Sequence, residues 1–269
     1  ILEAARQLGM QVMPEGGSTF MHNMNMIVDG HTTVEHNMPP ETLYDDVLQL
    51  WKGSGTANTP TLVVSYGGLT GENYWYQHTD VWKHPRLMTF VPRYVVEPRS
   101  RRRQKAPEGD YNHIRISQNL KKLVDQGQLV NVGAHGQLAG LALHWEMWMF
   151  EQGGMSPYEA LRAATLSPAQ TMGMDGELGS IEAGKLADLV VMDKNPLENI
   201  RNSDSVSMVM LNGRLFDAAS MDQIGPERDR VGSKAFGEGA GALGIGKWWS
   251  QNSDGQGLAH TTCSCGSVH

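Results

Sequence analysis

Residues 11–37, QVMPEGGSTFMHNMNMIVDGHTTVEHN, decide the fold that the sequence predicts. Residues 11–13 are expected to form a short apolar strand that ends in Glu15 and a pair of glycines. A methionine-rich helical segment follows, and residues 32–35 form a second strand that leads to His36. Two strands joined by a helix are typical of a βαβ unit with its chemistry at the carboxyl ends of the strands. The interpretation of the whole chain depends on whether Glu15 and His36 point into one shared site.

The composition is that of an ordinary globular protein with a sizeable core. The chain has 269 residues, of which 40% are hydrophobic and 19% charged, and its formal net charge is −7. Because the chain is acidic and its one basic run is confined to residues 99–105, we expect no nucleic-acid partner. No stretch approaches the roughly 18 apolar residues of a membrane span. Cys263 and Cys265 form no disulfide framework, so the compartment stays open.

Predicted strands and helices alternate along the first part of the chain. Strands are expected at residues 59–66 and 129–132, and helices at residues 1–9, 39–51, 111–126, 138–152 and 158–165. This alternation predicts an α/β sheet or barrel. Residues 69–110, rich in aromatic residues, proline and arginine, are predicted to form a long irregular loop, of the kind that often serves as a lid or an insertion.

The C-terminal third has a different pattern. Residues 177–218 are predicted to form a small β module, with a hairpin that turns at Asn212-Gly213, the strongest two-residue turn signal. Residues 219–269 are rich in glycine and serine and are expected to form a loosely ordered tail. Residues 1–9 resemble the middle of a helix, so the chain looks like a C-terminal piece of a longer protein.

Three side chains that follow predicted strands are the main candidates for chemistry: Glu15, His36 and His135. Catalytic groups of an α/β barrel cluster at this edge. Carboxylates and neutral imidazoles bind divalent ions such as Zn²⁺, and a catalytic zinc site uses about three protein ligands and a water. One histidine after one strand is more often structural, but three such positions on successive β–α units favour a shared site.

Other polar residues have simpler interpretations. His31 is an alternative partner for the site, although it lies in a turn, and His22 is expected on the surface of the helix between the strands. Glu35 should point to the opposite side of its strand from His36 and is interpreted as structural. Asp188 and Asp193 flank a predicted strand and are interpreted as turn or salt-bridge residues.

Two groups in the predicted long loop leave alternatives open. The run Arg101-Arg102-Arg103 is most simply a solvated surface, and contact with a substrate carboxylate is the less favoured interpretation. Tyr74, Trp75 and Tyr76 form an aromatic cluster that is large for an exposed loop. This cluster either covers a substrate pocket or packs against the core.

Several runs resemble a known family. ALRAAT at residues 160–165, SPA at residues 167–169 and LGSIEAGKLADLVV at residues 178–191 resemble the C-terminal signature of the metal-dependent amidohydrolase superfamily. Residues 33–36 are similar to the end of the family's sixth strand, whose histidine lies at the metal centre. The resemblance covers about residues 1–217.

The closest likeness is to amidohydrolases fused behind a TolB-like β-propeller, through GENYWY at residues 71–76 and GAHGQ at residues 133–137. The family fold is a (β/α)₈ TIM-type barrel with a small β-sandwich built from both chain ends. The resemblance therefore implies that residues 1–176 hold barrel strands five to eight and that residues 177–218 hold part of the sandwich. The strand-one His-x-His pair that anchors the metal is not in this sequence.

The resemblance also implies partners. They are a small-molecule or peptide substrate and the missing N-terminal half of the same protein. The sheet edge left open at strand five predicts that this missing half, or a second copy in a homo-oligomer, covers it. The propeller-fused relatives favour a periplasmic or exported protein over a cytoplasmic one.

The implied activity is that of a metal-dependent hydrolase of amide, peptide or cyclic amide C–N bonds, which uses metal-activated water. Glu15 and His36 would hold a divalent metal, with Zn²⁺ preferred, and His135 would carry the proton. Tyr74, Trp75 and Tyr76 would bind the substrate.

Two departures from the family pattern qualify this expectation. The fifth strand usually ends in histidine, where this chain has Glu15, and the eighth usually ends in aspartate, where it has His135. Glutamate is an acceptable zinc ligand, and a neutral imidazole is a competent general base. The departures motivate an alternative, a catalytically degenerate scaffold or binding module. A weaker alternative is a relative that uses the metal for mutase-like or decarboxylating chemistry.

Overall fold

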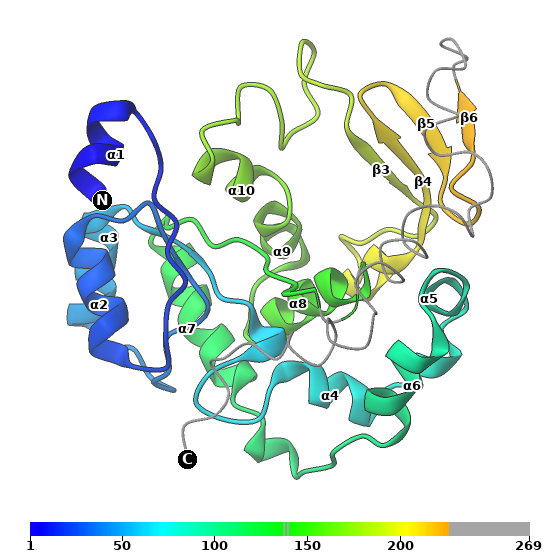
Figure 1. Cartoon of the computed structure of the whole chain (residues 1–269), viewed down its shortest axis with the longest axis horizontal. Helices are drawn as coiled ribbons and strands as arrows, with labels where there is room; N and C mark the ends of the chain where they lie inside the picture. Colours follow the sequence, from blue (N-terminus) through cyan, green and yellow to red (C-terminus); the bar gives the residue numbers. More distant parts are fainter. Residues whose placement is uncertain (137, 139, 226–269) are drawn as a thin grey trace.

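The computed structural model describes residues 1–136, 138 and 140–225 (Figure 1). The helices are α1 (Leu2–Leu8), α2 (Phe20–Asp29), α3 (Asp45–Ser54), α4 (Gly71–His78), α5 (Pro85–Phe90), α6 (Arg93–Arg101), α7 (His113–Asp125), α8 (Leu141–Gln152), α9 (Pro157–Ala163) and α10 (Leu166–Thr171). Short 3-10 turns are η1 (Leu62–Val64), η2 (Val81–Lys83), η3 (Glu108–Asp110) and η4 (Ile200–Asp204). The strands are β1 (Thr33–Glu35), β2 (Ala57–Thr59), β3 (Leu189–Met192), β4 (Val206–Leu211), β5 (Arg214–Asp217) and β6 (Gln223–Gly225). None of these described helices is long and apolar enough to cross a bilayer.

Four chain segments run parallel to one another in sequence order. β1 and β2 form a parallel pair at the centre. A parallel bridge joins Glu15 to Glu35 on the outer side of β1, and another joins Val130 to Asn58 on the outer side of β2. Backbone hydrogen bonds of 2.8 to 3.1 Å continue the pairing at both bridges. This arrangement is that of a partial α/β barrel, as predicted, and it brings the four carboxyl ends to one edge.

Two of the expected strands are shorter in the structure. Each of the outer segments, at residues 12–16 and 129–131, contributes one isolated bridge rather than a strand. The strand expected at residues 59–66 is wrong, because β2 ends at Thr59 and the chain turns into η1. Leu62 and Val63 are fully buried in that turn. A short buried apolar run has the same sequence pattern in a turn as in a strand.

The long loop expected at residues 69–110 is also wrong, since this segment contains α4, α5 and α6. These helices have six to nine residues, too few turns for a clear helical period. Trp75 and Tyr76 of α4 are buried in the core instead of covering an exposed surface. Trp75 stacks on Trp145 of α8, with ring centroids 6.3 Å apart.

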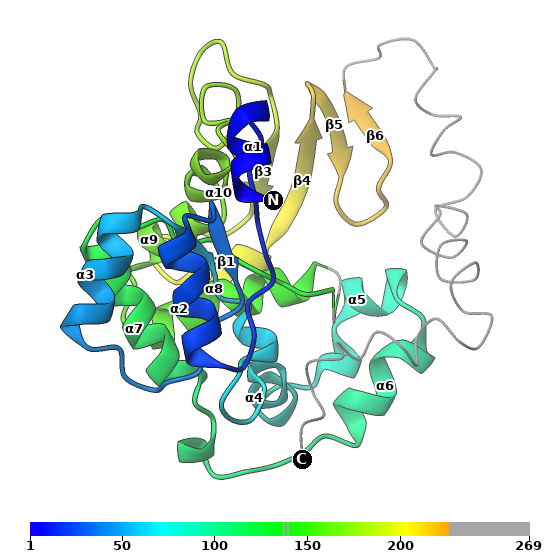
Figure 2. The same ribbon diagram turned by 60° about the vertical axis from the view of Figure 1, so that its left-hand side comes forward.

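Sheet β3–β6 is antiparallel and lies away from α2 and α3 (Figures 1 and 2). The hairpin prediction is confirmed: Asn212 and Gly213 have φ angles of 48° and 76° between β4 and β5. β6 extends this sheet beyond residue 219, where we expected the tail to begin. The rest of the expected tail, residues 226–269, lies outside the described residues.

Arg201 links η4 to the helices. Its guanidinium lies 4.3 Å from the ring centroid of Trp75 and 4.8 Å from that of Trp148. The indole N–H of Trp148 donates to the carbonyl of Ile200 at 3.0 Å. A cation between two aromatic rings and a buried hydrogen bond stabilise this junction.

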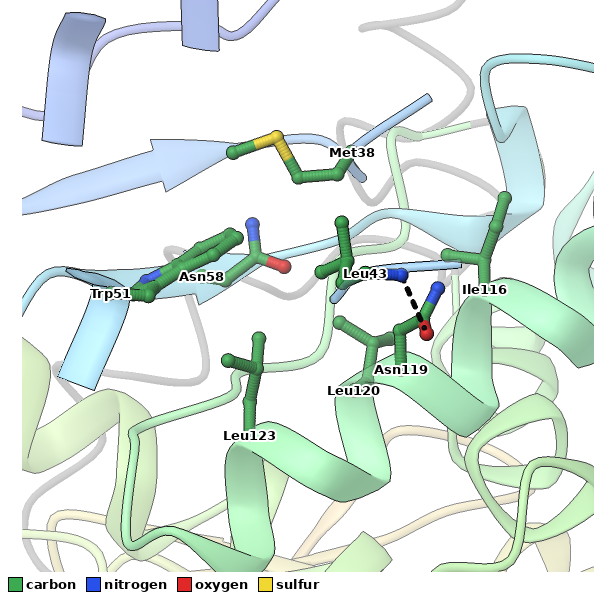
Figure 3. Close-up of a pocket in the computed structure, with 8 residues that line it drawn as sticks. All are labelled: Met38, Leu43, Trp51, Asn58, Ile116, Asn119, Leu120 and Leu123. Atoms are coloured by element: carbon green, nitrogen blue, oxygen red, sulfur yellow. Dashed lines mark hydrogen bonds between the residues drawn. The ribbon is translucent and has the colours of Figure 1, made fainter. Parts of the chain in front are cut away.

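A small cavity lies where α7 faces β2 (Figure 3). Its lining residues are Met38, Leu43, Trp51, Asn58, Ile116, Asn119, Leu120 and Leu123. The Leu43 N–H donates to Asn119 Oδ1 at 3.2 Å at its edge. Because its lining is mostly apolar, this cavity belongs to the hydrophobic core and not to the edge that carries the candidate residues.

The outer segments generate a prediction about association. Among the described strands, each outer segment bridges to one neighbour only, so the partial barrel has two open edges. Open edges of buried sheets pair with other chains. We expect residues 1–269 alone to self-associate when measured by light scattering after gel filtration. A monodisperse monomer would contradict this.

Buried His113 predicts a pH-dependent stability. Burial lowers its pKa to about 4, and its ring lies 3.1 Å from Gln152 Oε1. The folded state therefore favours the neutral ring, and the stability that this contributes is complete above the unfolded pKa of about 6.5. It is lost as the pH falls toward 4, to a total of about 3 kcal/mol. Urea unfolding of wild type and His113→Gln between pH 7 and 4 should give a shallower pH slope for the variant. Equal slopes would refute this assignment.

Candidate functional site

The ends of three parallel segments have unusual backbone geometry. His36 follows β1 with φ 70°, Thr61 follows β2 with φ 52°, and His135 follows the segment 129–131 with φ 51°. Residues other than glycine adopt these left-handed conformations at a cost of about 1–3 kcal/mol, and such residues cluster at functional sites. The strain therefore marks the carboxyl edge of the strands as the candidate site.

The structure brings the three sequence-predicted residues together. His36 Nε2 lies 3.3 Å from Glu15 Oε1. The rings of His36 and His135 meet edge to face, with centroids 5.2 Å apart. Tyr66 lies on another side of His36, also at a centroid distance of 5.2 Å. Glu15 and His36 thus share one site, which answers the question that the sequence poses.

The electrostatics of the site centre on His36, whose side chain is only 6% exposed. Burial lowers its pKa, the nearby His135 lowers it further, and the carboxylate of Glu15 acts in the opposite direction. Its Nδ1 is buried and has no hydrogen-bond partner among the described residues. An orphaned buried nitrogen is costly unless a ligand or a bound group takes it.

Two side chains at this site are of types that coordinate a divalent metal ion. The carboxylate of Glu15 and the imidazole of His36 are both zinc ligands by type. No group of three or more metal-binding side chains occurs within the described residues. A catalytic zinc site uses about three protein ligands, and Glu15 and His36 are two side chains of a suitable type.

Buried amides hold the end of β1 in place. Asn58 Nδ2 donates to the carbonyls of Val34 and His36 at 2.6 and 2.9 Å. The N–H of Tyr66 donates to Asn37 Oδ1 at 2.8 Å. These bonds fix the backbone on both sides of His36 and set the position of its ring.

The aromatic cluster of α4 packs beside Glu72 and the hydrophobic core. Tyr76 donates its hydroxyl to Glu72 at 3.1 Å, and burial raises the pKa of this tyrosine. Trp75 packs in the core, and Tyr74 is half-buried with its ring 4.3 Å from that of His78.

Sequence reasoning missed Glu72. Its side chain is 12% exposed, and burial raises its pKa. The guanidinium of Arg99, 3.5 Å away, opposes that shift most strongly, followed by the Tyr76 hydroxyl, and His135 contributes less.

The glycine before Glu72 has a structural reason. A Cβ at Gly71 would lie 2.4 Å from the carbonyl oxygen of Leu62. Only glycine allows α4 to start against η1.

The remaining candidates have structural partners away from the site. His31 Nδ1 bonds the carbonyl of Met26 at 2.9 Å, and His22 is exposed on α2. Glu35 accepts from the hydroxyl of Thr33 at 2.6 Å. Asp188 accepts from the N–H of Asn212 at 2.6 Å, which supports its turn role.

In the arginine run, Arg101 pairs with Glu97 at 3.6 Å and Arg103 with Asp80 at 3.5 Å. These are surface ion pairs, the simpler of the two interpretations.

The sequence profile of the Amidohydrolase family matches residues 1–216. The chain belongs to this family. Guanine deaminase of Escherichia coli (strain K12) is 35% identical over 100 residues, which are 34% of this chain and 23% of that protein. Ochratoxinase of Aspergillus niger is 36% identical over 80 residues, which are 28% of this chain and 16% of that protein.

Solved structures show the same fold. A Xaa-Pro dipeptidase with bound methionine in the active site aligns with a TM-score of 0.57 and 24% identity, and the alignment covers 80% of this chain and 47% of that one. Ochratoxinase of A. niger aligns with a TM-score of 0.54 and 20% identity over 81% of this chain and 44% of its own. The amidohydrolase chain described here thus spans less than half the length of each of these proteins.

Asn58 provides a test of the site's support. Replacing Asn58 by Ala removes two buried side-chain hydrogen bonds and should lower the free energy of unfolding by about 1–3 kcal/mol. Urea unfolding measures this change. Asn25→Ala, an exposed position on α2, is the matched control and should change stability by less than about 0.5 kcal/mol. Equal effects of the two variants would show that Asn58 does not stabilise the end of β1.

Proposed function

We propose that this chain carries part of the active site of a metal-dependent hydrolase that cleaves amide, peptide or cyclic amide C–N bonds. The observation that carries the proposal is the meeting of Glu15, His36 and His135 at the strand ends. Relatives named for a deaminase and for an N-acetylgalactosamine-6-phosphate deacetylase support this class of reaction.

Glu15 and His36 would hold the metal, for which Zn²⁺ is our preferred ion because both residue types bind it. When bound, the ion would activate a water and polarise the scissile carbonyl. The carboxylate of Glu15, 3.3 Å from Nε2 of the buried His36, supports this role. The missing ligands would come from outside the described residues, in keeping with the partial length of the chain.

His135 would carry a proton to the leaving nitrogen. Its ring lies against that of His36, and its backbone is exposed at the end of a strand segment. A histidine at this place can exchange protons with solvent between turnovers. The neighbouring carboxylate of Glu72 would stabilise the imidazolium form.

Tyr74, Trp75 and Tyr76 would shape the substrate pocket as parts of α4. Only Tyr74 is exposed enough to touch a substrate directly, while Trp75 and Tyr76 would act by packing the helix in place. The substrate would be a small molecule or a peptide.

A second candidate function is a scaffold or binding module without catalysis. It is motivated by the two departures from the family pattern, Glu15 and His135. A strand that ends in His-x-His upstream in the whole protein would favour the enzyme. A product assay would separate hydrolysis from the mutase-like or decarboxylating alternative.

His36→Ala in the whole protein tests the proposal. The variant should lose at least a hundredfold in turnover and most of its bound metal, because it removes a ligand. Metal content is measured by mass spectrometry of the purified protein and turnover with a panel of dipeptides and N-acylated amino acids. His22→Ala, an exposed histidine on α2, is the matched control and should change neither. Unchanged metal content and turnover in His36→Ala would overturn the assignment.

A further inference from the structure

Glu146 of α8 is a fully buried carboxylate, with none of its surface exposed. Oε1 accepts the N–H of Leu62 at 2.8 Å, and Oε2 lies 3.3 Å from the N–H of Val63. The backbones of Thr61 and Gly133 lie close enough to this carboxylate to favour its charged form. Two backbone donors of the η1 turn therefore bind one side chain, and the segment before His135 lies beside it.

This arrangement suits a carboxylate and no other side chain. Two carboxylate oxygens offer about four acceptor positions, whereas a carboxamide offers two and turns its NH₂ toward other donors. Burial raises the pKa of Glu146 to about 8, and the neighbouring backbone groups oppose that shift. The successive N–H groups of the η1 turn form an anion-binding nest.

The two segments beside Glu146 both lead to the candidate site. Thr61 is the left-handed residue after β2, and its Oγ1 would lie 2.4 Å from a Cβ at Gly133. Gly133 stands two residues before His135 in the sequence. Close approach of these backbones determines where the chain leaves the strands, and hence where the His135 ring lies.

We propose that Glu146 is a positioning residue that holds His135 against His36, by fixing the η1 turn, against which Gly133 packs at Thr61. The expected loss of activity rests on the proposed function, whereas the expected position of the His135 ring does not. Glu146 touches no substrate group and acts through the backbone of two strand ends.

The experiment compares Glu146→Gln and Glu146→Asp with wild type in the whole protein. Histidines carry ¹³C and ¹⁵N labels, and the His135 ring signal is assigned by its loss in His135→Asn. Glu146→Gln should shift or broaden this signal and lower kcat for an Ala-Pro dipeptide at least thirtyfold, with KM changed less than threefold. Glu146→Asp keeps the carboxyl group and should recover at least a third of kcat and the wild-type signal.

Leu123→Ala is the control for lost stability. Leu123 is fully buried on α7 and lines the core cavity of Figure 3, so the variant should lose stability while the His135 signal stays in place. If Glu146→Gln does not fold, Gly133→Ala takes its place. That substitution pushes the segment away from Thr61 with Glu146 intact, and it should shift the His135 signal in the same way.

The outcomes separate the two hypotheses. A folded Glu146→Gln with an unmoved His135 signal, or an equal shift in Leu123→Ala, would overturn the positioning role. So would a Glu146→Asp that recovers nothing. If wild type cleaves no member of the dipeptide and N-acyl panel, the proposed function fails. The His135 signal then still decides whether Glu146 positions that ring.

Discussion

Parallel pairing around β1 and β2 is the constraint on which the site depends. Parallel strands in sequence order bring their carboxyl ends to one edge, whatever the lengths of the connections. Here the pairing is thin, since the outer segments each contribute a single bridge. Buried polar side chains therefore hold the edge together: Asn58 bonds the end of β1, and Glu146 accepts hydrogen bonds from the η1 turn that follows β2.

The strain at the strand ends and these buried polar groups belong to one arrangement. Left-handed His36, Thr61 and His135 each oppose folding by about 1–3 kcal/mol. Hydrogen bonds to the neighbouring backbone offset that cost, because each unmade buried bond would cost a similar amount. Because the chain turns at Thr61 instead of continuing as a strand, the backbone N–H of Leu62 is available to donate a hydrogen bond to Glu146. The backbone at the strand ends, which positions the candidate residues, is thus stabilised by buried side chains that are not themselves candidate residues.

The sequence predicts the candidate residues at the strand ends better than it predicts the buried residues that hold those strand ends in place. Glu15, His36 and His135 follow apolar runs, and that position alone placed them together. Thr61 could not be foreseen as a turn, because β-branched residues favour strands and its apolar neighbours are buried in either structure. Glu146 has an available signal, a lone acidic residue between Trp145 and Met147. Its backbone neighbours lie about 13 and 85 positions away in sequence, a distance that no local period reveals.

The two departures from the family pattern are related by the structure. The resemblance implies histidine after the fifth strand and aspartate after the eighth, and this chain has Glu15 and His135 at those places. The pair therefore keeps one carboxylate and one imidazole with their positions exchanged. The carboxylate of Glu15 lies 3.3 Å from His36 Nε2. Since a divalent cation is held by the total charge of its shell, an exchange preserves that charge better than either change alone. Under the proposed function, the two departures together would rearrange the metal site and keep its charge.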